Sequence, residues 1–183
     1  MTAEPSLITI RTPGLQLPEP GTARETYSRT ERVSVATLAL VAALALKLIS
    51  GDRSRHKLVI LDEAWAFFNS AQGRALLNRL VRLGRAFNAT ILLVTQQVED
   101  LGELSQLVGD VWLFGQDSIR AAGRSVQEIG LDPEEGGLAA RLTEFRRGRC
   151  LVRDLRGRVG EAQVDPLPAL LARLDTTPRE VPG

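Results

Sequence analysis

Residues 57–65 read KLVILDEAW, a short run of aliphatic side chains that ends at two carboxylates. The four residues 58–61 are all apolar, a pattern typical of a strand covered on both faces in the interior of a parallel sheet. Residues 89–97 read ATILLVTQQ and repeat this pattern, with Thr95 and Gln96 after the apolar run. The two segments therefore predict two strands of one parallel sheet.

A helix is expected between these strands, because residues 72–87 carry apolar side chains at helical spacing, namely Leu76, Leu80, Leu83 and Phe87. A further helix is expected at about 100–108, followed by a strand in the sequence DVWLFG at 110–115. This alternation of strands and helices predicts right-handed βαβ units and an α/β fold, with a mostly parallel sheet flanked by helices.

The segment that precedes the first strand of this series has two parts. Residues 1–27 are interpreted as a short strand at Leu7–Arg11 and a loop rich in proline and glycine. A helix is expected from about residue 28 to 49, with Ser28 or Thr30 as its cap. Its apolar run, residues 33–49, is short for a membrane span and carries polar interruptions, so a helix buried on most sides is favoured.

The last third of the chain changes character. Helices are expected at about 118–129 and 134–146. Residues 148–166 alternate between apolar and polar side chains around an Arg156-Gly157 turn, which predicts a β-hairpin. Residues 165–174 are expected to form a short amphipathic segment, and 175–183 a flexible tail.

The composition is that of a globular chain and excludes several classes of protein. The 183 residues are 44% hydrophobic and 25% charged, with a formal net charge of +1. Cys150 is the sole cysteine and His56 the sole histidine, which excludes a disulfide scaffold and argues against a four-ligand zinc site. The charge balance gives no case for a generally basic nucleic-acid binder. Arginine greatly outnumbers lysine, which suits phosphate contacts but also follows from a GC-rich coding bias.

The carboxylates at the end of the first strand are the strongest indication of chemistry. Asp62 and Glu63 follow the apolar run and so lie at the carboxyl edge of the sheet, where open α/β sheets bind ligands. In phosphoryl-transfer enzymes, one acid at this place holds Mg²⁺ and the next orients or deprotonates the attacking water. The alternative is that both acids cap the amino end of the next helix.

Gln96 ends the second strand at the same predicted edge. A glutamine there can hydrogen-bond both a terminal phosphate and the attacking water, although it equally suits a loop that needs its amides satisfied. Arg74, Arg82 and Arg85 fall near one face of the helix between the strands. Arg85 is a candidate arginine finger for a neighbouring subunit, and the alternative is a solvated basic face.

One half of an ATP site is absent from the sequence. A phosphate-binding loop of the form G-x-x-x-x-G-K-[ST] needs a Gly-Lys pair, but Lys47 follows Leu46 and Lys57 follows His56. We therefore expect the chain to carry the water-and-metal half of a nucleotide site without the half that grips the phosphates.

The combined motifs resemble a known family. LVILDEAW, the later GRAFNATILLVTQ and the terminal GRCLVRDLRGRVGEAQVDPLP are similar to the RecA-like P-loop ATPases of bacterial type IV secretion and conjugation systems, which are related to hexameric DNA translocases. The likeness extends from about Leu7 onward. It implies that residues 1–183 are the carboxyl-terminal portion of a RecA-like ATPase domain that lacks its P-loop strand, loop and helix.

The resemblance also implies roles for particular residues. Asp62 would hold Mg²⁺ through water, Glu63 would be the catalytic carboxylate, and Gln96 would be the sensor. Arg85 would reach ATP in its own or an adjacent subunit, and Arg153 in the hairpin is a weaker candidate for nucleotide binding. ATP and Mg²⁺ are the implied cofactors, both expected only together with the phosphate-binding half.

The family context implies partners and a place in the cell. The parent protein is expected to be a homo-hexamer in the cytoplasm at the inner face of the cell membrane, in contact with other subunits of the secretion machine and with DNA as a further partner. The chain alone is expected to be inactive. Two alternatives remain, a non-catalytic RecA-like interaction module and a fragment of a hexameric DNA translocase that uses its arginines on backbone phosphates.

Overall fold

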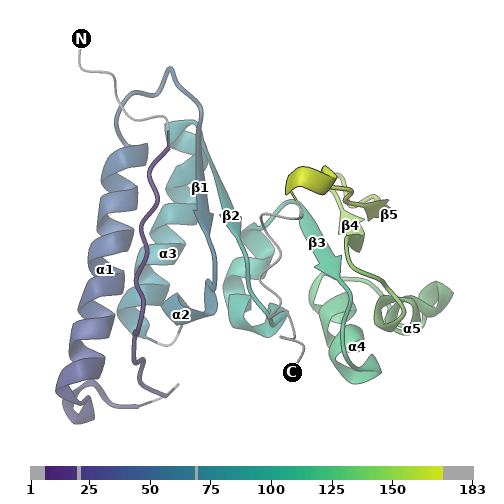
Figure 1. The fold of residues 1–183 in the computed structure, drawn as a ribbon, viewed down its shortest axis with the longest axis horizontal. Coiled ribbons are helices and arrows are strands. Elements are labelled where there is room, and N and C mark those ends of the chain that lie inside the picture. Colours follow the sequence, from purple (N-terminus) through teal and green to yellow (C-terminus); the bar gives the residue numbers. More distant parts are fainter. Residues whose placement is uncertain (1–6, 20–21, 69, 171–183) are drawn as a thin grey trace, which may run out of the picture. The chain divides into compact units, whose positions relative to one another are not determined.

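The computed structural model describes residues 7–19, 22–68 and 70–170 (Figure 1). The chain divides into two compact units, Met1–Leu107 and Val108–Gly183. The first combines a parallel pair of strands with helices, and the second combines helices with an antiparallel sheet. The predicted α/β class is therefore confirmed. The expected tail at 175–183 and the end of the segment at 165–174 lie outside the described residues.

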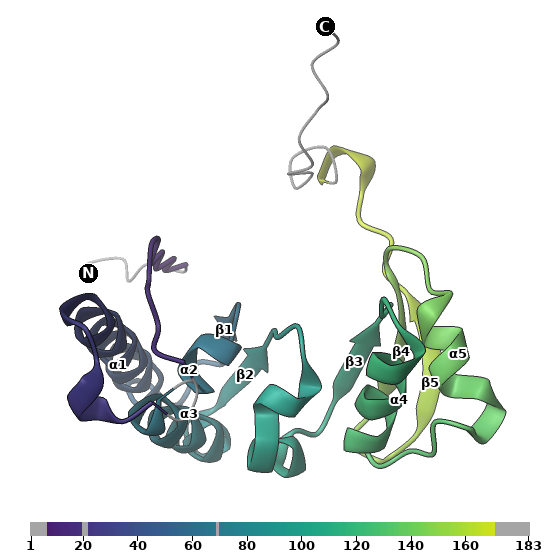
Figure 2. The same ribbon diagram turned by 90° about the horizontal axis from the view of Figure 1, so that it is seen from below.

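The first unit is built on two adjacent parallel strands. β1 (Lys57–Leu61) pairs with β2 (Ala89–Leu93) in the register Lys57↔Ala89 to Leu61↔Leu93. Helices α1 and α3 lie on the same face of this pair (Figure 2). The unit's helical segments are η1 (Arg24–Thr26), α1 (Arg29–Ile49), α2 (Trp65–Phe68), α3 (Ala71–Gly84), η2 (Arg85–Phe87) and η3 (Val98–Leu107).

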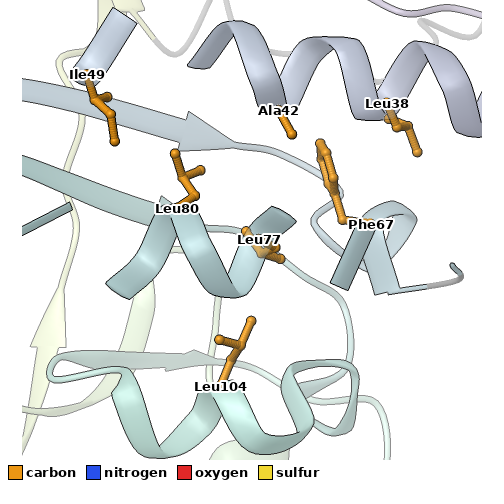
Figure 3. Packing of buried hydrophobic residues seen from close by; sticks show 7 residues of the cluster. All are labelled: Leu38, Ala42, Ile49, Phe67, Leu77, Leu80 and Leu104. Atoms are coloured by element: carbon orange, nitrogen blue, oxygen red, sulfur yellow. The ribbon is translucent and has the colours of Figure 1, made fainter. Parts of the chain in front are cut away.

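The core of the first unit lies between α1, α3 and the inner face of the two strands. Figure 3 shows its buried side chains, which come from both helices and from their neighbours: Leu38, Ala42, Ile49, Phe67, Leu77, Leu80 and Leu104. The inward face of α3 is centred on Leu77 and Leu80, which are 1% and 0% exposed. Of the predicted helix face, Leu80 is therefore fully buried, whereas Leu83 is only partly buried.

α1 begins where the sequence predicts. Ser28 is its N-cap, and a capping box forms because the Ser28 hydroxyl accepts from the backbone N–H of Glu31 while the Glu31 carboxylate accepts from that of Ser28. Hydrogen bonding of the Glu31 carboxylate, first with the Ser28 side chain and then with the Ser28 backbone, lowers the pKa of Glu31. The expectation of a helix buried on most sides is wrong, because only one face packs on the core. The other face leaves apolar side chains exposed, namely Val33, Leu40, Leu44 and Leu48. By length and composition alone, α1 also qualifies as a membrane-crossing helix.

The strands are likewise covered on one face only, which corrects the expectation of strands buried on both. Val59 and Ile91 contact the core, whereas the alternate residues Leu58 and Ile60 are 58% and 57% exposed. Side chains alternate between the faces of a strand, so a helical layer on one face leaves every second side chain uncovered. The apolar run was predictive of a strand but not of its coverage.

Two other strand predictions also need correction. Leu7–Arg11 has no strand, and Leu7 and Ile8 are 81% and 50% exposed, because no described strand pairs with this segment. The strand in DVWLFG exists as β3 (Val111–Phe114), but it does not pair with β2. It pairs antiparallel with β4 (Arg149–Arg153), so its hydrogen-bonding groups are satisfied by the hairpin rather than by a βαβ unit.

The second unit is a three-stranded sheet packed against two helices. Its order is β3-β4-β5, with β4 and β5 (Val159–Gln163) forming the predicted hairpin. α4 (Ile119–Glu128) is capped by Ser118 and packs with α5 (Leu138–Thr143), which follows the short η4 (Glu135–Gly137). Both helices are shorter than the predicted 118–129 and 134–146. The core of the unit includes Leu113, Val126, Leu142 and Leu151.

Candidate active site

The candidate site lies at the carboxyl ends of β1 and β2. Strand pairing continues beyond the last paired residues, because the N–H of Val94 donates to the carbonyl of Leu61 at 2.9 Å and that of Ala64 donates to the carbonyl of Val94 at 2.8 Å. The two chain segments therefore leave the sheet side by side. This geometry brings the acid pair of the first strand next to the polar residues that follow the second.

The backbone turns sharply at the acid pair. Glu63 has a φ of 52°, in the left-handed region that is uncommon for a residue with a long side chain. Its N–H donates to Oδ1 of Asp62 at 3.0 Å, which fixes the turn between the two acids. Conformations of this kind cost free energy and are concentrated at functional sites, where the surrounding structure holds them.

The carboxylate of Glu63 is held by hydrogen bonds from two sides. Nε2 of Gln96 donates to Oε1 and Oε2 of Glu63 at 3.2 and 3.4 Å, so the amide and the acid predicted to share an edge of the sheet do meet. Nε1 of Trp65 also donates to Oε2 of Glu63. The sequence interpretation gave Trp65 no role. The sequence did contain a signal for this contact, because Trp65 comes two residues after Glu63 and its indole N–H can donate a hydrogen bond but cannot accept one.

Asp62, Glu63 and Gln96 are all exposed, so no hydrophobic side chain of the described residues covers them. Within the described residues, no group of three His, Cys, Asp or Glu side chains could hold a metal ion by itself. A site with one or two carboxylates fits Mg²⁺, which retains several waters and takes its remaining ligands from phosphates. The residues present therefore suit a magnesium ion that arrives with a nucleotide.

Of the two arginines that were given a role in nucleotide binding, Arg85 belongs to the first unit and Arg153 to the second. Arg85 is exposed at the end of α3, before β2 begins, whereas Gln96 follows the end of β2. A strand rises about 3.3 Å per residue, so Arg85 is at the opposite edge of the sheet from Gln96. The structure therefore does not bring Arg85 to the Glu63 carboxylate of its own chain.

Arg153 belongs to the second unit and has a structural contact there. Its Nη1 donates to the carbonyl of Ile129 at 2.9 Å, at the carboxyl end of α4, where a cation also complements the helix dipole. In the same unit, Glu161 forms ion pairs with Arg149 and Arg141. The hydrogen bond from the Arg149 side chain is the main cause that lowers the pKa of Glu161.

Comparisons with known proteins give the family of the chain and a structure of similar fold. The sequence model of a family described as an AAA-like domain matches residues 1–173. The uncharacterized protein YddE of Bacillus subtilis (strain 168) is 20% identical over 169 residues, which are 91% of this chain but only 20% of that protein. The structure of VirB4 of Thermoanaerobacter pseudethanolicus is similar over 79% of this chain and 40% of that one, with a TM-score of 0.63 and 18% identity. This likeness confirms the RecA-like fold, and the chain spans a minor part of both proteins.

Proposed function

Because the chain belongs to the family of AAA-like domains, we propose that it is the carboxyl-terminal portion of an ATP-hydrolysing motor of a type IV secretion or conjugative transfer system. It supplies the acids and the sensor amide of the ATP site. The phosphate-binding half comes from other residues, because the Gly-Lys pair that such a loop requires does not occur in this sequence.

The observation that carries the proposal is the contact between Gln96 and Glu63. The two residues are 33 positions apart, and Nε2 of Gln96 donates to the carboxylate of Glu63. The contact lies at the edge of the sheet where α/β proteins bind ligands. Helix capping alone gives no reason for this contact, since a capping carboxylate accepts from backbone N–H groups of its own helix. A catalytic carboxylate next to a sensor amide does account for it.

Each residue has a distinct task in this proposal. Asp62 holds Mg²⁺ through water, and the bound ion neutralises charge on the phosphates. Glu63 orients the attacking water and accepts its proton, because its carboxylate oxygens have lone pairs available. Gln96 senses the terminal phosphate through its amide. Arg85, which is far from its own Glu63, acts on the nucleotide of a neighbouring subunit, and Arg153 is the weaker candidate for nucleotide binding.

The assembly proposed for the parent protein follows the same family context. We propose a homo-hexamer in the cytoplasm at the inner face of the membrane, in contact with other secretion subunits and with DNA as a further partner. An arginine that acts across a subunit boundary requires such an oligomer, and the position of Arg85 at the opposite edge of the sheet supports this requirement.

The proposal is tested with a longer chain that joins these residues to a phosphate-binding loop (the extended ATPase). An in-frame coding stretch for Gly-Lys-Thr or Gly-Lys-Ser is expected in the DNA upstream of the start codon, and it defines the chain to express. We expect Mg²⁺-dependent ATP hydrolysis by the extended ATPase and none by the 183-residue chain. Lack of hydrolysis by a folded extended ATPase would instead favour the non-catalytic interaction module.

A further inference from the structure

We propose that Trp65 is a positioning residue for Glu63, which keeps the carboxylate in place when Gln96 turns to the nucleotide. This inference rests on the proposed function, because it assigns Trp65 a part in the work of Glu63. Its starting point is that the Glu63 carboxylate accepts from two donors of different origin, the indole Nε1 of Trp65 and the amide Nε2 of Gln96.

The first donor belongs to the same turn as Glu63. Trp65 is the first residue of α2, and the turn is fixed by hydrogen bonds from the N–H of Ala66 to the carbonyl of Glu63 and from that of Phe67 to the carbonyl of Ala64, both at 3.0 Å. Phe67 is 5% exposed in the core, so α2 is anchored. The indole and the carboxylate that it contacts are therefore parts of one local structure.

The second donor, Gln96, comes after β2 and is also proposed to bind the nucleotide. Gln96 is exposed, and its side-chain amide has both donor and acceptor groups that suit a phosphate and a water molecule. When these groups engage the nucleotide, they no longer hold Glu63. The indole has a single N–H donor, and its contact with Glu63 already uses it, so Trp65 has no further polar group with which to engage the nucleotide. Trp65 is then what keeps the carboxylate oriented.

Removal of the indole N–H is expected to lower turnover more than substrate binding. Trp65→Phe keeps an aromatic ring but has no donor. In the extended ATPase, we expect kcat to fall by about 10- to 100-fold, since small misplacement of a catalytic group has effects of this size. KM for ATP should stay within about 2-fold, because Trp65 does not contact the phosphates in this account. Trp112→Phe is the matched control, since it makes the same change on the exposed side chain of β3 and is expected to leave kcat unchanged.

The contact itself is tested in the 183-residue chain without nucleotide. The chain has two tryptophans, so its nitrogen–proton NMR spectrum contains two indole resonances, and Trp112→Phe assigns them. In Glu63→Ala, we expect the Trp65 resonance to shift and its proton to exchange faster with water, while the Trp112 resonance stays in place. This variant leaves both indoles intact, so the test does not depend on whether Trp65→Phe folds.

The outcomes separate the inference from the proposed function. A Trp65 resonance that does not respond to Glu63→Ala overturns the positioning role, as does a folded Trp65→Phe variant with the kcat of the unmodified protein. If the Trp65 resonance responds to Glu63→Ala but the folded extended ATPase hydrolyses no ATP, the proposed function fails and the contact stands. If the extended ATPase is active and Glu63→Gln leaves its hydrolysis intact, Glu63 is not the catalytic carboxylate, and the positioning role of Trp65 is overturned although the proposed function stands.

Discussion

Glu63→Gln is expected to lower the rate of ATP hydrolysis by the extended ATPase by about 10²- to 10⁴-fold, the range over which a positioned general base contributes. Glutamine has nearly the size and shape of glutamate and still offers an oxygen to the indole of Trp65. It cannot accept the proton of the attacking water. ATP binding is expected to remain, because the phosphates are gripped by the other half of the site.

The rate is measured as steady-state phosphate release with saturating ATP and Mg²⁺, and nucleotide binding is measured separately by calorimetry. Glu128→Gln is a suitable control, since it makes the same change at an exposed residue at the end of α4. Turnover of Glu63→Gln within about 2-fold of the control would remove Glu63 from the chemistry.

Leu80→Ala is expected to destabilise the first unit by about 2–5 kcal/mol, the usual cost of truncating a fully buried leucine. Leu80 is 0% exposed and lies with Leu77 in the core that α3 forms with α1 and the strands. Truncation leaves a cavity that the close-packed neighbours fill only in part. This core packs against β1 and β2, so its destabilisation also weakens the strands that position Asp62 and Glu63.

The change is measured as the free energy of unfolding from urea titrations monitored by circular dichroism. Leu92→Ala provides the comparison on the same small sheet, because Leu92 is on the outer face and is 46% exposed. A half-exposed leucine should cost only about 1 kcal/mol. Equal losses for the two variants would show that the outer face is as well covered as the inner one, against the structure described above.

Local signals in the sequence predicted much of the first unit. The apolar runs predicted β1 and β2, and the helical spacing in residues 72–87 predicted a helix where α3 and η2 lie. Ser28 was one of the two predicted caps of α1, and it is the actual one, because its hydroxyl satisfies an N–H that the helix leaves free. The meeting of Gln96 with Glu63 was also predictable, since the carboxyl ends of parallel strands share one edge. Each of these depends on interactions between residues close in sequence or on a general property of parallel sheets.

Other features depend on which segments meet, and the sequence pattern does not specify that. An apolar side chain such as Leu40 or Ile60 has the same pattern whether or not another segment covers it, and both are exposed. β3 was predicted as a strand, but its antiparallel pairing with β4 is a choice of partner across a long stretch of chain. Trp65 belongs to the motif that carried the family resemblance but had no role of its own, because an aromatic residue near a core is usually explained by packing. The structure shows that its N–H donates to Glu63.

The central claim is that Gln96 and Glu63 act as one unit at one ATP site. A double-mutant cycle in the extended ATPase tests it directly, with kcat measured for Glu63→Gln, Gln96→Ala and the double variant. If the two residues serve the same step, the double variant should be about as slow as Glu63→Gln alone, because residues that act together are strongly non-additive. If the two single effects instead multiply in the double variant, Gln96 and Glu63 act independently and the account is contradicted.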